Sequence, residues 1–233
     1  MAPSRIHQAG TIGRTPQREP APAKAGVWSW DITKLKGPAK WTYYYLYVVL
    51  DIYSRRVVGW QIAEAETATL FEPLFHETVA KHNVPPGQLT LHADRGGPMK
   101  AKATALLLSD LGVIKSHSRP HTSNDNPYSE AHKTLKYQPR FPKNFGGIED
   151  ARAFCRRFFD WYNQEHHHSG IGLMTPDQVH FGQADAVHAA RQDTLDRAFR
   201  ENRARFVNKR PNPPDKPTAA WINPPQPKPM AQV

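Results

Sequence analysis

The chain has 233 residues, 39% of them hydrophobic, which is enough to bury the core of one domain of roughly 150 residues with flanking segments. Its formal net charge of +10 predicts an acidic partner, and nucleic acid is the commonest such partner. No run approaches the roughly 20 apolar residues that cross a bilayer, and a single cysteine, Cys155, excludes an intramolecular disulfide. We therefore expect no membrane partner and a cytoplasmic protein.

The composition divides the chain into three parts. Residues 1–26 hold four prolines among small and basic residues, which predicts a disordered basic N-terminal segment. Residues 27–182 have the patterns of a folded core. From residue 183 to 233 we expect one short basic helix and then a disordered tail, because eight prolines fall between Pro211 and Pro229.

The first part of the core reads as three strands, over residues 27–34, 41–52 and 56–63. Turn residues at Gly37-Pro38 and Ser54-Arg55 join them, which predicts an antiparallel meander. A helix is expected from Thr67, because apolar residues at 70, 71, 74, 75 and 79 fall on one helical face.

Strands and helices alternate in the rest of the core, which predicts parallel pairing and a mixed α/β fold. A strand ends just before Asp94, a helix follows near residues 101–111, and a short strand spans 113–116. Residues 148–164 carry the clearest apolar stripe of a helix. Thr175-Pro176-Asp177 has the pattern of an N-cap, a first-turn proline and a first-turn acid of another helix.

Three acids occupy positions that favour a joint role. Asp31 lies inside an otherwise apolar strand, Asp94 follows a buried strand and precedes two glycines, and Glu130 opens a helix after a turn-rich segment. Each acid alone has an ordinary interpretation as a solvated or helix-capping residue. Together, two strands and a helix could bring oxygen ligands to a pair of Mg²⁺ ions, which are hard ions that prefer oxygen.

Two other acids compete for these roles, and a histidine run offers a different metal. Asp51 lies in a comparable strand, but Arg55 and Arg56 are near, so we expect a structural ion pair. Asp125 is expected to stabilise its own turn. Residues 166–168 are three consecutive histidines, but adjacent side chains diverge and a closed zinc site needs four converging ligands.

Five segments resemble the DDE transposases of bacterial insertion sequences, whose integrase core is similar to that of retroviral integrases. The segments are Trp-Ser-Trp-Asp-Ile-Thr-Lys-Leu (28–35), Leu-Asp-Ile-Tyr-Ser-Arg (50–55), His-Ala-Asp-Arg-Gly (92–96), Ser-Asn-Asp-Asn-Pro-Tyr-Ser-Glu (123–130), and Trp-Tyr-Asn followed by Thr-Pro (161–176). The resemblance implies a ribonuclease-H-like fold with a mixed five-stranded sheet flanked by helices. It also implies that residues 27–182 form an integrase catalytic core.

The resemblance assigns roles to individual residues and partners. Asp31, Asp94 and Glu130 are expected to be catalytic and to hold two Mg²⁺ ions, with Mn²⁺ as a substitute. The expected DNA-binding residues are Arg95, Lys100, Arg119, His121, Asn126, Lys133 and Lys136. The expected partners are the DNA of the element ends and of the target, further copies of the chain on DNA, and a separate helix-turn-helix protein. The expected location is the bacterial cytoplasm, at the nucleoid when DNA is bound.

One departure from the family pattern bears on activity. The family usually has one further residue, often Phe, between the segments matched by Ala131-His132 and by Lys133-Thr134-Leu135-Lys136. Lys136 then stands six rather than seven places after Glu130, which rotates it roughly 120° from the glutamate's helical face.

The sequence thus predicts a transposase core that cleaves DNA and joins strands, with activity impaired by the deletion. Two alternatives stay open: an impaired remnant that only binds DNA, and a nuclease of the same fold.

Overall fold

The core of the fold is a mixed five-stranded sheet. In this computed structural model, residues 26–94, 96–117, 130–207 and 209–220 are described. The strands are β1 (Gly26–Lys36), β2 (Tyr43–Asp51), β3 (Val57–Ala63), β4 (Leu89–Ala93) and β5 (Ile114–His117), in the order β3-β2-β1-β4-β5. The first three strands pair antiparallel, and β4 pairs parallel with both β1 and β5. The predicted meander and the predicted parallel half are both confirmed.

The central strand β1 separates two hydrophobic clusters because its side chains alternate between the two sheet faces. Trp28 and Trp30 pack with α1 (Ala68–Lys81) on one face, where the ring of Trp30 stacks on Phe71 at 3.4 Å between centroids. Leu35 packs on the other face with α5 (Ile148–Gln164). Odd-numbered positions of β1 therefore face α5, and even-numbered positions face α1.

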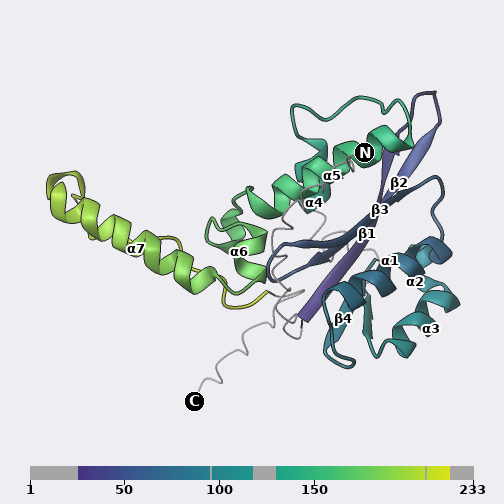
Figure 1. The fold of residues 1–233 in the computed structure, drawn as a ribbon, viewed down its shortest axis with the longest axis horizontal. Helices are drawn as coiled ribbons and strands as arrows, with labels where there is room; N and C mark the ends of the chain where they lie inside the picture. Colours follow the sequence, from purple (N-terminus) through teal and green to yellow (C-terminus); the bar gives the residue numbers. More distant parts are fainter. Residues whose placement is uncertain (1–25, 95, 118–129, 208, 221–233) are drawn as a thin grey trace, which may run out of the picture.

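Helices cover both faces of the sheet, as Figure 1 shows. The short helices α2 (Gly97–Lys100) and α3 (Lys102–Asp110) lie on the side of α1. On the opposite side α4 (Glu130–Lys136) buries Leu135 in the cluster that α5 builds. The fold class predicted from the sequence is confirmed in its sheet and its flanking helices. Among the described residues, no helix is both long and apolar enough to span a membrane.

The C-terminal part departs from the expected short helix. After η3 (Ser169–Ile171), α6 (Pro176–His180) begins with the predicted cap, since Thr175 Oγ1 accepts from the Gln178 N–H at 3.3 Å. Then α7 (Ala184–Glu201) runs for 18 residues, is followed by η4 (Arg203–Arg205), and extends away from the sheet (Figure 1). The expectation of a short helix was wrong, because half-buried residues recur along one side of α7 and meet a returning segment.

Residues 209–220 return along α7 to the core, so this part of the predicted disordered tail has defined contacts. Arg210 forms an ion pair with Asp196 through two hydrogen bonds of 2.8 and 2.5 Å. The Tyr53 hydroxyl donates to the Pro217 carbonyl oxygen at 3.0 Å. We call α7, η4 and the described residues 206–207 and 209–216 the arm. Of the predicted disordered segment 1–26, Gly26 is the first residue of β1, and residues 1–25 lie outside the described residues, as do residues 221–233 of the predicted tail. The other predicted domain boundaries stay predictions.

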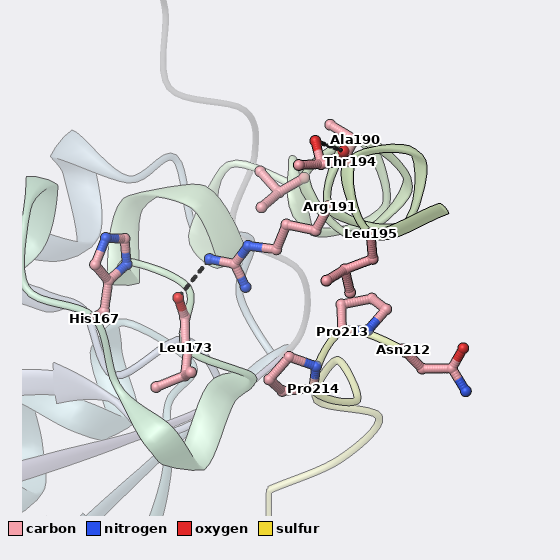
Figure 2. Close-up of a pocket in the computed structure, with 10 residues that line it drawn as sticks. His167, Leu173, Ala190, Arg191, Thr194, Leu195, Asn212, Pro213 and Pro214 are labelled. Carbon is pink, nitrogen blue, oxygen red and sulfur yellow. Dashed lines mark hydrogen bonds between the residues drawn. The ribbon is translucent and has the colours of Figure 1, made fainter. Parts of the chain in front are cut away.

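A cavity of about 800 Å³ lies where the arm meets the core (Figure 2). Arg191 of α7 reaches across it and donates to the carbonyl oxygens of Gly172 and Leu173 at 2.7 and 2.6 Å. None of the predicted site residues lines this cavity. It therefore belongs to the attachment of the arm rather than to the candidate site.

Candidate active site

Asp31 of β1 lies level with Asp94, which directly follows β4. Trp30 of β1 pairs with Ala93 of β4 in the parallel register, and both side chains pack on the α1 face. Asp31 and Asp94 each come one residue later, with Asp31 inside β1 and Asp94 directly after the last residue of β4. The parallel register thus sets two acids that are separated by 62 residues in the chain at matching positions, and Asp31 lies on the face that α4 covers. The approach of the two carboxylates to each other stays a prediction.

The carboxylate of Asp31 is held at both oxygens. The backbone N–H of Ile32 donates to Oδ1 at 2.9 Å. On the other side, Nδ1 of His132 in α4 lies 3.1 Å from Oδ2. The His132 side chain is buried, and its Nε2 has no hydrogen-bond partner among the described residues. The sequence analysis did not identify His132, because nothing near it in the chain indicates a contact with Asp31.

Asp94 is fixed by the loop that follows β4. The Gly96 N–H donates to Asp94 Oδ1 at 2.7 Å. A Cβ atom at position 96 would lie 3.0 Å from the same oxygen, so a side chain there would crowd the carboxylate. This explains why a glycine follows the acid so closely and supports a defined orientation of Asp94.

Glu130 is the first residue of α4, as predicted, but its side chain lies outside the described residues. Its backbone is two residues before His132, whose ring contacts Asp31. The helix that carries Glu130 is therefore docked on the strand that carries Asp31. The convergence of all three carboxylates stays a prediction.

Lys136 lies against the site strand. Its ammonium donates to Thr33 Oγ1 at 2.6 Å, on the same face of β1 as Asp31. The cause is Leu135, which is fully buried and fixes the rotation of α4. The expected rotation of Lys136 from the helical face of Glu130 stays a prediction, because the Glu130 side chain lies outside the described residues. The pKa of Lys136 is lowered by burial, while the nearby charge of Asp31 acts in the opposite direction.

The other predicted DNA-binding residues are only partly accounted for. Lys100, at the end of α2, and Lys133, on α4, are exposed. Arg95, Arg119, His121 and Asn126 lie outside the described residues, as does Asp125. Binding of DNA by these residues stays a prediction.

Asp51, the last residue of β2, lies far along the sheet from Thr33 and Lys136, and its contacts connect elements of the fold. It is buried opposite Trp28, near the start of β1, where Ser54 Oγ donates to its Oδ2 at 2.5 Å. His180 Nδ1 of α6 lies 3.1 Å from the same oxygen. We expected an arginine partner, whereas Arg56 pairs with Asp177 at 2.7 Å. Asp51 thus joins β2 to α6, a partner 129 residues away that local sequence could not indicate.

The donor chemistry at Asp31 and Asp94 fits a hard divalent cation, because both supply carboxylate oxygens. Among the described side chains, no group of three or more His, Cys, Asp or Glu could hold a metal ion, and Glu130 is not among them. His168 belongs to the three consecutive histidines that were considered for zinc. It is buried, which lowers its pKa to about 4, and it packs edge-on against Tyr162. A metal site formed by Asp31, Asp94 and Glu130 therefore stays a prediction.

Two family models match the chain, both described as integrase core domains, over residues 21–123 and 111–176. The transposase for insertion sequence element IS904 of Lactococcus lactis is 29% identical over 158 residues, which cover 67% of this chain and 61% of that protein. Transposase InsF for insertion sequence IS3A of Escherichia coli is 29% identical over 153 residues, covering 65% and 52%. The chain thus spans about half to three fifths of the length of these relatives.

Solved structures show the same fold at lower identity. The catalytic core domain of BIV integrase superimposes with a TM-score of 0.51 at 21% identity, covering 70% of this chain and 97% of that one. A chain of the simian T-cell lymphotropic virus intasome in complex with PP2A regulatory subunit B56 gamma gives a TM-score of 0.52 at 17% identity, covering 71% and 60%. The expected ribonuclease-H-like fold is therefore confirmed.

Proposed function

The chain belongs to the family of integrase core domains, and we propose that it is the catalytic core of an insertion-sequence transposase. In this proposal it cleaves DNA at the element ends and joins the resulting 3′-hydroxyl to target DNA. Two observations support the proposal: the parallel register of β1 and β4 sets Asp31 level with Asp94, and α4, which Glu130 opens, contacts Asp31 through His132.

The chain's own residues prepare this face for metal-dependent chemistry. Asp31, Asp94 and Glu130 would hold two Mg²⁺ ions, with Mn²⁺ as a substitute. When bound, such ions activate the attacking hydroxyl and stabilise the leaving oxygen of a phosphodiester. The Ile32 N–H and His132 orient the carboxylate of Asp31, and the Gly96 N–H orients that of Asp94. Donors that hold a ligand carboxylate in place reduce the reorganisation needed when the ion arrives.

Cations on both sides of the sheet would position the DNA backbone. Lys133 is exposed on α4, Lys136 lies beside the site strand, and Lys100 is exposed on α2 beyond the loop that follows Asp94, so all three can meet phosphate. We propose the same role for the predicted residues Arg95, Arg119, His121 and Asn126. Phosphate contacts fix orientation without reading sequence, so recognition of the element ends falls to another module. A separate helix-turn-helix protein and further copies of this chain on DNA are the partners that we propose, in the bacterial cytoplasm.

The direct test is strand transfer with pre-cut oligonucleotides in Mg²⁺. The wild-type chain should join the 3′ end to target DNA, and Asp31→Asn and Asp94→Asn should each lose joining by at least about 100-fold. Asp160→Asn, an exposed acid on α5, is the matched control and should join normally. Cutting without joining would identify a nuclease, and binding alone would identify a remnant, so either result would refute the proposal.

A further inference from the structure

We propose that the tip of the arm is a second DNA-binding surface, which grips the phosphate backbone of duplex DNA away from the carboxylates. This inference rests on the proposed function only in taking DNA as the substrate. The arm tip comprises the cations at the outer end of α7, in η4 and where the chain turns back: Arg197, Arg200, Arg203, Arg205 and Lys209. All five residues are exposed.

The arm uses its other cations internally. Arg210 pairs with Asp196, Lys216 pairs with Asp185, and Arg191 donates to two carbonyl oxygens of the core. Within the described part of the chain, none of the five tip cations forms an ion pair with an acid. Two tip cations also have contacts inside the arm, because the Arg203 guanidinium lies 5.9 Å from the centre of the Phe199 ring and the charge of Arg200 acts on Asp196. Contacts within the arm therefore explain the internal cations better than they explain the exposed cluster at the tip.

The charge at the tip is concentrated and predominantly positive. Residues 197–209 hold five Lys or Arg and one acid, Glu201, so their formal charge is 5 − 1 = +4. Like charges gathered on one small surface repel one another unless a polyanion is bound. When such a cluster binds a DNA duplex, it releases counterions that were condensed on the phosphates, and this release makes the binding free energy more favourable.

The arm presents this charge from a rigid base. A helix of 18 residues is about 27 Å long, so the tip stands well away from the sheet, as Figure 1 shows. Arg191 ties the base to Gly172 and Leu173, and the rings of Phe199 and Phe206 pack edge to face at 5.6 Å near the tip. A tip held in this way loses little conformational entropy when it binds.

Duplex DNA fits the tip better than an anionic membrane does. Four of the five tip cations are arginines, whose planar guanidinium can donate two hydrogen bonds to one phosphate. A helix that binds a membrane surface exposes a broad apolar face beside its charges. In α7 the half-buried side meets the returning segment instead, through contacts such as Gln192 Nε2 to the Pro211 carbonyl oxygen at 3.4 Å.

The test is the salt dependence of DNA binding by the full chain. Arg197→Gln/Arg200→Gln removes two charges from α7, and Arg156→Gln/Arg157→Gln removes two exposed charges from α5 as the matched control. Fluorescence anisotropy with a duplex of about 30 bp should show that the tip variant binds about tenfold more weakly near 0.1 M salt. Its slope of log affinity against log salt should be shallower by between about 1 and 2, since each phosphate contact contributes roughly 0.9. The control should match the wild type.

A second pair, Arg205→Gln/Lys209→Gln, lies outside α7 and guards against a local change in helix stability. It should weaken binding in the same way. Tip variants that bind duplex with wild-type affinity and slope would overturn the inference, and so would loss of binding to anionic vesicles without loss of binding to DNA. Neither result would change the outcome of the strand-transfer test, because that test depends on the carboxylates and not on the tip of the arm.

Discussion

His132 Nδ1 lies 3.1 Å from Asp31 Oδ2, which joins α4 to the central strand at the carboxylate proposed to bind metal. The two residues are 101 positions apart in the chain. Because the Ile32 N–H holds the other oxygen, the orientation of Asp31 is set before a metal ion arrives. Outer hydrogen bonds of this kind commonly change metal affinity by about 10- to 100-fold.

Replacing His132 should therefore weaken metal binding. His132→Phe removes the donor but keeps a ring in the buried space, and we expect Mn²⁺ to bind about tenfold more weakly. His132→Asn keeps an N–H close to the position of Nδ1 and should stay within about threefold of the wild type. Titration followed by the electron paramagnetic resonance of free Mn²⁺ gives both values. Tighter binding by His132→Phe would mean that the histidine competes with the metal.

The sequence predicted those elements whose signals are local. The strands β1 to β3 and helix α5 have clear apolar patterns, and the parallel pairing that sets Asp94 beside Asp31 follows from alternation of strands and helices. The contacts of Asp31 with His132 and of Asp51 with His180 join distant positions, so no local pattern indicates them. The length of α7 was missed because the returning segment, with its many prolines, supplies the surface against which the helix packs.

An inserted residue tests which half of α4 sets the activity. Leu135 and Lys136 anchor the second half, so placing one Phe between His132 and Lys133 should rotate Glu130 by about 100° and restore its family spacing to Lys136. We expect strand transfer to be at least about tenfold faster, because a misplacement of about 1 Å can cost on the order of 100-fold in rate. Slower joining would show that the contact of His132 with Asp31 matters more than the spacing of Glu130.

The attachment of the arm should depend on Gly172. Its φ is +67°, and a Cβ atom there would lie 2.5 Å from the carbonyl oxygen of Asp215. Gly172→Ala should lower the free energy of unfolding by roughly 1 to 3 kcal/mol. Gly182 has φ +71° and open space where a Cβ would lie, so Gly182→Ala introduces backbone strain without a steric clash. Its free energy of unfolding should therefore fall by less than that of Gly172→Ala. Equal losses in urea denaturation would show that the approach of Asp215 is unimportant.

The free energy of unfolding should decrease as the pH is lowered below about 6.5, and His82 should cause part of that decrease. Burial lowers the pKa of His82 to about 4, helped by the charges of His180 and Arg56, whereas the unfolded chain has a pKa near 6.5. Between these values the unfolded state binds more protons, so stability is lost as pH falls through 6.5 toward 4.

The expected loss between pH 7 and pH 5 from His82 alone is roughly 2 kcal/mol. His82→Gln does not titrate and can still donate to the Val58 carbonyl oxygen, which lies 3.2 Å from His82 Nε2. Its free energy of unfolding should therefore decline by about 2 kcal/mol less than that of the wild type over this range. The same decline in both proteins would assign the pH dependence to other groups.

A crystal structure with Mn²⁺ and a DNA end, with the metal located by anomalous scattering, tests the central claim most directly. We predict metal bound on the face of the sheet under α4, with oxygens of Asp31, Asp94 and Glu130 as ligands at about 2 Å. A structure that places any two of these carboxyl groups more than about 10 Å apart, or the metal elsewhere, would contradict the assignment of the site.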